Sequence, residues 1–379
     1  MTAGTVPKRI VMIDIARLYA MALVFYGHFI EELMLLKNTA AAGQYKFIYS
    51  FHMVLFIVLS GTIAKENVLE WGTGRFLKQR FISRLLPYIF FTFLMMIPPI
   101  FFQGKFYGLS LPSVQGYTGG LISTVFGLPS FDIPSWFLLL IFSVELVHFC
   151  VFRFLKDSTY KIVAAALIFY VGGYLLNLKL DLFNPLKGRT VGWNYLFLHE
   201  AITLYSFYLV GVLLTRLGLF RKVVSMKIVA PAAIGAFLAV LFTYRLNNGP
   251  FAFHVYDAVV ILFSSHGNML LFPLTALAGC AFVLLAASFT PALKPLVWLG
   301  QNTLLLMCLN GIFYHYLNPP LAKLVQTGIA PSGLGLLGIA CTVTLVSLIL
   351  CMPFVFAFNR YVPQLVGKPS LHKMDKAIL

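Results

Sequence analysis

The chain has 379 residues, of which 60% are hydrophobic and only 11% carry a charge. Soluble domains contain roughly 25% charged residues, so this composition excludes an ordinary water-soluble protein and predicts one embedded in membrane lipids. The formal net charge is +16. Membrane proteins collect Lys and Arg in their cytoplasmic loops, so this excess predicts no nucleic-acid partner.

Apolar runs of about 20 residues, each long enough to cross a bilayer as a helix, recur along the chain. We therefore expect an all-α polytopic membrane protein, with one transmembrane domain over residues 1–379 and no appended soluble domain. The ten predicted spans are 10–35, 46–64, 82–103, 134–153, 162–178, 194–215, 228–245, 268–288, 296–317 and 333–358.

The distribution of basic residues predicts the orientation. An even number of spans places both termini on one side, and with cytoplasmic termini 20 of the 28 Lys and Arg residues lie on the cytoplasmic side. This bias favours cytoplasmic termini in a multi-pass cell-membrane protein, and we expect a bacterial cytoplasmic membrane. The first apolar stretch is too long for a signal peptide and contains charged residues, so we expect it to be retained.

Span one carries ionisable side chains, which are costly in a membrane and mark candidate functional sites. Arg17 and His28 are eleven residues apart, so they lie within about 20° of the same helix face and about 16 Å apart along the axis. Asp14, three residues before Arg17, is close enough to pair with it. A structural network between helices is the alternative interpretation of the Asp14–Arg17 pair.

Three further patterns follow. Span two begins with Ser50-Phe51-His52-Met53, so His52 lies at a depth like that of His28, and it ends with Ser60-Gly61. Arg80 and Arg84, one helical turn apart, present a fork suited to phosphate oxygens, although a basic cluster that only sets topology has the same sequence. The Gly- and Pro-rich segment 104–133 is either a surface loop or a lid over a cavity.

Together, Asp14-Ile15-Ala16-Arg17, His28, and the stretches 50–61 and 80–87 resemble the acyltransferase-3 family. Within it, the chain is most similar to the fucose O-acetyltransferase branch known from nodulation-factor modification. The resemblance is closest over the first 90 residues. It implies a ten-span inner-membrane enzyme that takes an acetyl or other short acyl group from cytoplasmic acyl-CoA. The implied acceptor is a hydroxyl of a carbohydrate or glycolipid, and no metal is expected.

The resemblance also suggests roles for single residues. Arg17 and His28 match the essential pair of the family, and Arg80 and Arg84 match its cytoplasmic arginines. An imidazole of ordinary pKa, about 6.5, suits a general base, so His28 is expected to take the proton of the acceptor hydroxyl. The other predicted roles are assistance to His28 from His52 or Asp14, acetyl-CoA binding by Arg17, Ser60, Arg80 and Arg84, and acceptor binding by Trp136, His199 and Glu200.

The chain departs from the family pattern at two positions. Many larger members carry Trp-Ser-Leu-x-x-Glu in span four, whereas here Trp136 is followed by Phe137-Leu138 and the glutamate is Glu145. Relatives often have histidine in span nine where this chain has Asn310. The roles of Glu145 and Asn310 therefore stay open at this point.

Two other classes of protein share part of this pattern. A transporter of a small molecule or glycan precursor also has many spans, buried charges and Gly-rich interruptions, but it often shows two related halves, which this sequence lacks. A non-enzymatic export or assembly subunit needs no ionisable face on span one. Slow hydrolysis of acetyl-CoA without an acceptor is expected of an acyltransferase and of neither rival.

Overall fold

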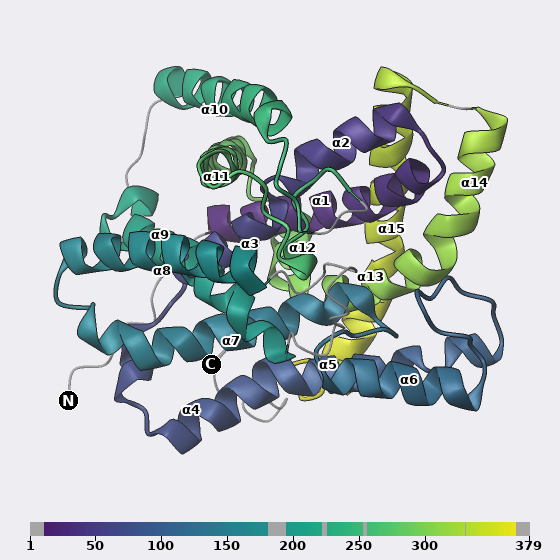
Figure 1. Ribbon diagram of the computed structural model, residues 1–379, viewed down its shortest axis with the longest axis horizontal. Helices are drawn as coiled ribbons and strands as arrows, with labels where there is room; N and C mark the ends of the chain where they lie inside the picture. The colour runs from purple at the N-terminus through teal and green to yellow at the C-terminus, as the bar shows by residue number, and fades with distance from the viewer. Residues whose placement is uncertain (1–10, 181–194, 222–225, 253–255, 330, 369–379) are drawn as a thin grey trace.

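The computed structural model describes residues 11–180, 195–221, 226–252, 256–329 and 331–368 (Figure 1). Within these ranges most of the chain is helical, and the β structure is one isolated bridge between Val260 and Ser265. Nine of the described helices are long and apolar enough to span a membrane, or ten if a bent pair counts as one span. The predicted all-α polytopic fold is therefore confirmed.

The helices follow the predicted spans closely, although several spans are divided. The first half of the chain contains α1 (Val11–Leu35), α2 (Thr39–Tyr49), α3 (His52–Thr62), α4 (Thr73–Arg80), α5 (Leu86–Met95), α6 (Val114–Val125), α7 (Trp136–Val151) and α8 (Thr159–Leu180). The second half contains α9 (Leu198–Arg216), α10 (Met226–Leu246), α11 (Leu271–Phe289), α12 (Lys294–Gln301), α13 (Thr303–Ile312), α14 (Asn318–Gly328) and α15 (Gly333–Tyr361).

The ninth span is not the straight helix that the sequence predicts over 296–317. The chain bends by 76° between α12 and the helices that follow. At the bend, Asn302 leaves helical geometry with φ −114° and ψ 21°. Its amide donates to the Trp298 carbonyl at 2.7 Å, and its Oδ1 accepts from Asn359 and Lys368. These side-chain bonds compete with the helical backbone pattern and hold the break.

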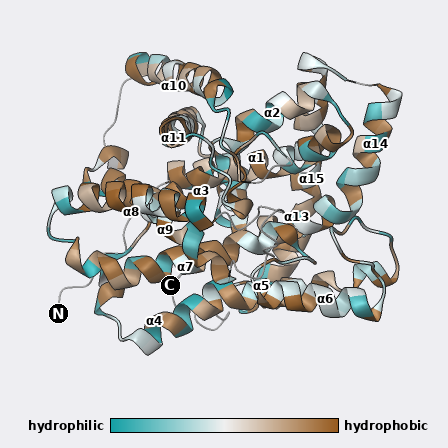
Figure 2. Ribbon diagram, in the orientation of Figure 1, coloured by the Kyte–Doolittle hydropathy of each residue, from teal (hydrophilic) through white to brown (hydrophobic). Residues whose placement is uncertain are grey.

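Burial separates central helices from peripheral ones. In the most apolar window, 78% of residues are buried in the α2–α3 span and 72% in α1 and in the α7 span, against 17% in α10. Figure 1 shows α1 near the middle of the molecule and α10 at its edge. Figure 2 shows that α10 is nevertheless mostly hydrophobic, as is expected of a helix whose outer face contacts lipid. The ionisable face of α1 is thus placed in the interior.

Glycines let two pairs of helices approach closely at this interior. A side chain on Gly61 of α3 would collide with the Tyr208 carbonyl of α9, and one on Gly211 of α9 with the Val58 carbonyl of α3. A side chain on Gly300 of α12 would likewise meet the Asp14 carbonyl of α1. Small residues permit such backbone contact between membrane helices.

Two π-helical turns interrupt the bundle. One, Phe81–Leu85, joins α4 to α5, and the other, Phe313–Leu317, joins α13 to α14. Such turns are rare and occur often at functional sites. The second turn also anchors the segment 104–133: the Lys105 amide donates to the His315 carbonyl at 2.8 Å. That segment contains α6, capped by Ser113, so it is more ordered than a plain surface loop.

Candidate active site

His28 lies in the second half of α1 and is held by Asn310 of α13. The two side chains form a hydrogen bond between His28 Nδ1 and Asn310 Oδ1. Since Asn310 presents its carbonyl oxygen, Nδ1 donates, and Nε2 of the neutral ring is left as the acceptor. The ring also makes an edge contact with Tyr314, with centroids 4.8 Å apart. Asn310, whose role the sequence left open, therefore orients the His28 imidazole.

His28 lines a cavity of about 350 Å³, here called the histidine cavity. Its walls come from α1, α2, α3, α7, the segment 256–263 and the second π-turn, and five tyrosines and a tryptophan contribute. The lining residues are His28, Glu31, Leu35, Tyr45, Tyr49, His52, Met53, Tyr107, Leu128, Ile133, Trp136, Tyr256, Val259, Val260, Ile261, Leu262, Phe263 and Tyr314. Because Tyr107 and Leu128 belong to it, the segment 104–133 forms part of the cavity wall.

Glu31 is a cavity residue that the sequence analysis missed. It follows His28 by three residues and so lies on the same helix face. Tyr49 donates to Glu31 Oε2 at 3.0 Å and Tyr314 to Oε1 at 3.3 Å. Burial of Tyr256 and the nearby Glu31 carboxylate raise the pKa of the Tyr256 phenol. This phenol therefore stays protonated and can donate a hydrogen bond. The sequence could have indicated this residue, because Glu31 is a carboxylate three residues after His28 within an apolar span.

His52 faces the same cavity from the start of α3. It is 2% exposed, and its Nδ1 lies 2.9 Å from the Ile48 carbonyl oxygen, to which it donates. The neutral ring again leaves Nε2 as an acceptor. The structure thus brings His28 and His52 to one cavity, as the sequence predicts.

Arg80 and Arg84 lie at a second cavity, of about 240 Å³, here called the arginine cavity. It also includes Ser60, so the structure groups three of the residues that were predicted to bind acetyl-CoA. Its lining residues are Ser60, Ile63, Ala64, Lys65, Val68, Leu69, Trp71, Phe76, Gln79, Arg80, Ser83, Arg84, Glu145, His148, Phe149 and Tyr208.

Glu145 is the partner of both arginines. Arg84 donates to it through Nε at 3.2 Å and Nη2 at 2.9 Å, a bidentate pair, and Arg80 Nη1 lies 3.4 Å from Oε1. The sequence analysis gave Glu145 no role, because its partners lie 61 and 65 positions earlier in the chain. Two buried donors in this cavity, Arg80 Nε and Ser83 Oγ, have no hydrogen-bond partner among the described residues. A polar group bound in the cavity would satisfy both donors.

Asp14 and Arg17 lie nearer the start of α1. Their closest N–O distance is 4.0 Å, and Gln301 of α12 donates to Asp14 at 3.3 Å. The described residues that line either cavity do not include Asp14 or Arg17. The predicted pairing of Asp14 with Arg17 is confirmed, while the structure does not bring either residue to His28.

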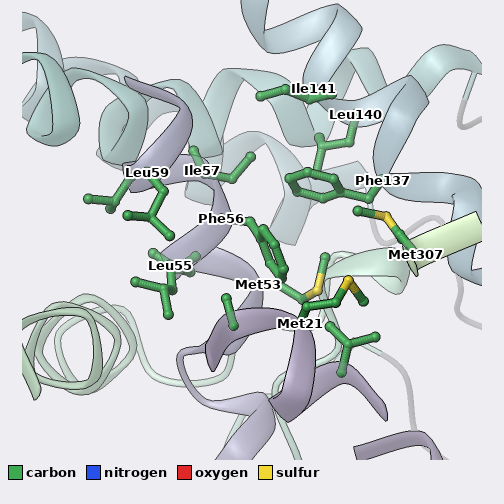
Figure 3. Packing of buried hydrophobic residues seen from close by; sticks show 14 of the residues in the cluster. Met21, Met53, Leu55, Phe56, Ile57, Leu59, Phe137, Leu140, Ile141 and Met307 are labelled. Carbon is green, nitrogen blue, oxygen red and sulfur yellow. The ribbon is translucent and has the colours of Figure 1, made fainter. Parts of the chain in front are cut away.

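The two cavities lie at different depths of the same helices. On α3 they are marked by Met53 and Ser60, about 10 Å apart, and on α7 by Trp136 and Glu145, about 13 Å apart. The residues between them are buried and apolar apart from Ser143. Figure 3 shows this packing; Phe56 and Phe137 have ring centroids 5.5 Å apart. The labelled residues include three methionines, Met21, Met53 and Met307.

Trp136, His199 and Glu200, the predicted acceptor residues, separate in the structure. Trp136 lines the histidine cavity, whereas His199 and Glu200 are absent from its described lining. His199 Nε2 lies 2.9 Å from Ser264 Oγ, directly after the cavity-lining Phe263. Glu200 Oε1 lies 2.7 Å from His266 Nε2. Both residues therefore support the segment that forms one cavity wall.

A known protein family matches most of the chain. No curated protein and no solved structure matches the chain. The acyltransferase domain of the acyltransferase-3 family matches residues 10–355, which include both cavities and the helices that build them. The chain therefore belongs to the acyltransferase-3 family.

Proposed function

We propose that this protein is an acetyl-CoA-dependent O-acyltransferase that acylates a hydroxyl of a cell-envelope or lipid-linked carbohydrate. The observation that carries the proposal is His28, with Nδ1 held by Asn310 and its ring on the wall of an aromatic, polar cavity. An imidazole oriented by a second residue and exposed to a cavity is the arrangement of a general base.

In the proposed reaction, the acceptor hydroxyl oxygen attacks the carbonyl carbon of the thioester. His28 Nε2 takes the hydroxyl proton, the C–S bond breaks, and the CoA thiolate leaves and is protonated. Glu31 accepts a hydrogen bond from another hydroxyl of the acceptor, and the tyrosines and Trp136 pack against its ring. Aromatic faces with a few polar groups are typical of sites for small polar ligands.

The arginine cavity is the proposed site for the phosphates of the acyl-CoA. Arg80 and Arg84 supply guanidinium groups there, and the Arg80 Nε and Ser83 hydroxyl supply the unpartnered donors. Guanidinium groups bind phosphate by charge-assisted hydrogen bonds. The thioester arm then extends along α1 past Arg17 toward His28. The excess of basic residues at this end of the bundle supports a cytoplasmic position for it.

The resemblance to the fucose O-acetyltransferase branch supports a sugar hydroxyl as acceptor and acetyl as acyl group. The test is mass spectrometry of cell-surface glycans from cells with and without the gene, in a bacterial host. We expect cells without the gene to lack an acetyl group on one glycan. The wild-type gene should restore this acetyl group, and the His28→Gln variant should not. Identical glycans in all strains would contradict the proposal. Purified protein is also expected to hydrolyse acetyl-CoA slowly without an acceptor.

A further inference from the structure

A second hollow adjoins the histidine cavity. It has a volume of about 440 Å³ and is here called the vestibule. Leu35, Tyr45 and Tyr256 line both the vestibule and the histidine cavity. The rings of Tyr45 and Tyr256 make an edge contact, with centroids 5.4 Å apart. The two hollows therefore lie on either side of the same three side chains.

The vestibule is more basic than the histidine cavity. Its charged lining residues are Lys37, Lys46 and Asp257, so it holds two ammonium groups and one carboxylate. Lys46 Nζ has a long contact, 3.4 Å, with Asn248 Oδ1, and lies 5.8 Å from the centre of the Phe251 ring. The histidine cavity, by contrast, contains the Glu31 carboxylate and no Lys or Arg among its described lining residues.

Local structure fixes Lys37 at this place. Helix α1 ends at Leu35, and Lys37 adopts a left-handed conformation with φ 68°. Asn38 then caps α2 by accepting a hydrogen bond from the Ala41 amide at 3.0 Å. After this tight turn, Lys37 lines the same hollow as Lys46 of α2. A non-glycine residue at positive φ persists where the surroundings hold it, and such positions are frequent at ligand sites.

From these observations we infer that the vestibule is a second acceptor subsite, which binds an anionic group on the part of the glycan next to the acylated sugar. The inference rests on the proposed function, because it extends the acceptor bound at the histidine cavity. Two ammonium groups against one carboxylate favour an anion, either a carboxylate or a phosphate. The acceptor is accordingly larger than one sugar and negatively charged beside the acylated residue.

Gly43 offers a way to block the vestibule without disturbing the fold. It lines the vestibule from α2, and a Cβ added there would meet nothing within 4 Å. Gly43→Leu also replaces a poor helix former by a good one. Gly172→Leu on α8 is the matched control, because a Cβ at Gly172 also meets nothing within 4 Å and Gly172 does not line either hollow.

The acceptor in this test is envelope glycan extracted from cells that lack the gene, and transfer of labelled acetyl from acetyl-CoA is measured. Four preparations are compared: the intact glycan, its carboxyl-reduced form, its dephosphorylated form and its monosaccharides. Gly43→Leu is expected to lower kcat/KM for the intact glycan by about tenfold or more through misplacement of the acceptor. It should leave transfer to the monosaccharides and the slow hydrolysis of acetyl-CoA unchanged. Gly172→Leu should behave as wild type.

The lysines are tested with a Lys37→Gln/Lys46→Gln double variant, with Lys323→Gln as the control. The double variant should raise KM for the intact glycan by about tenfold, the effect of a lost charge-assisted contact. Carboxyl reduction should abolish this difference if the anion is a carboxylate, and dephosphorylation if it is a phosphate. The inference would be overturned if the vestibule variants lost as much transfer to monosaccharides as to the intact glycan. It would also be overturned if neither Gly43→Leu nor the double lysine variant changed transfer. No transfer by the wild type to any preparation would instead contradict the proposed function.

Discussion

The histidine cavity and the arginine cavity share a plan and differ in charge. Each adjoins a π-helical turn, and each contains a buried glutamate. In the histidine cavity, neutral phenols donate to Glu31. In the arginine cavity, two guanidinium groups pair with Glu145. A carboxylate held by neutral donors suits an uncharged, hydroxyl-bearing ligand, whereas an arginine pair with unpartnered donors suits a phosphate.

The largest expected effect separates chemistry from binding at the histidine cavity. His28→Gln removes the proposed proton acceptor but keeps a hydrogen-bonding side chain of similar shape. Loss of a positioned base typically costs about 10²–10⁴-fold in rate, so transfer should fall by that amount at matched protein level. Affinity for acetyl-CoA, measured by calorimetry, should stay near wild type. A greater loss of activity in His52→Gln than in His28→Gln would show that the base is His52.

At the arginine cavity, the expected effect is on the KM for the acyl donor, acetyl-CoA. Arg84→Ala and Arg80→Ala should each raise KM for acetyl-CoA, since a charge-assisted hydrogen bond contributes about 1.5–3 kcal/mol, or roughly 10- to 150-fold. Lysine at either position should recover part of this, because it keeps the charge without the planar fork. Lys78→Ala is the control, since Lys78 is exposed on the same helix. Unchanged donor kinetics in the double alanine variant would leave the arginines with a topological role only.

A smaller effect is expected when Glu31 is changed. Glu31→Gln should raise KM for the glycan acceptor by a factor of roughly 2 to 13, the loss of one ordinary hydrogen bond of about 0.5–1.5 kcal/mol. The KM for acetyl-CoA should not change. Glu32→Gln is the matched control, because Glu32 is the next residue of α1 and is paired with Lys105 at 2.7 Å outside the cavity lining. Equal responses of the two variants would place Glu31 in a structural network.

The smallest change tests which side each cavity faces and should leave activity almost unaltered. In a variant with the exposed Cys150 and Cys341 replaced by Ser, new cysteines are introduced at Gly74 and Gly119. A Cβ at Gly74 meets nothing within 4 Å, and one at Gly119 meets only Leu109 at 3.8 Å. An impermeant thiol reagent should label Gly74→Cys from the cytoplasm and Gly119→Cys from outside. Reversed labelling would remove acyl-CoA from reach of the arginine cavity.

Local patterns in the sequence predicted most of the fold and part of the site. Hydrophobic run length located the apolar spans, and helical spacing predicted that Arg17 and His28 share one face of α1. The pairing of Glu145 with Arg84 and of His28 with Asn310 joins residues far apart in the chain, so no local period indicates it. The bend at Asn302 depends on Asn359 and Lys368 in the same way. Glu31 was within reach of the spacing argument that found His28.

The packed layer between the cavities bears on how the membrane stays sealed. Apart from Ser143, the residues that separate Met53 from Ser60 on α3 and Trp136 from Glu145 on α7 are buried and apolar. Apart from Ser143, these two stretches offer no polar side chain to ions or water, so on α3 and α7 they help to keep the bilayer sealed. Methionine side chains are flexible and adapt to irregular shapes, and Met21, Met53 and Met307 belong to the packed cluster in and beside this layer (Figure 3). The proposed passage of the thioester arm toward His28 requires these flexible side chains to move aside.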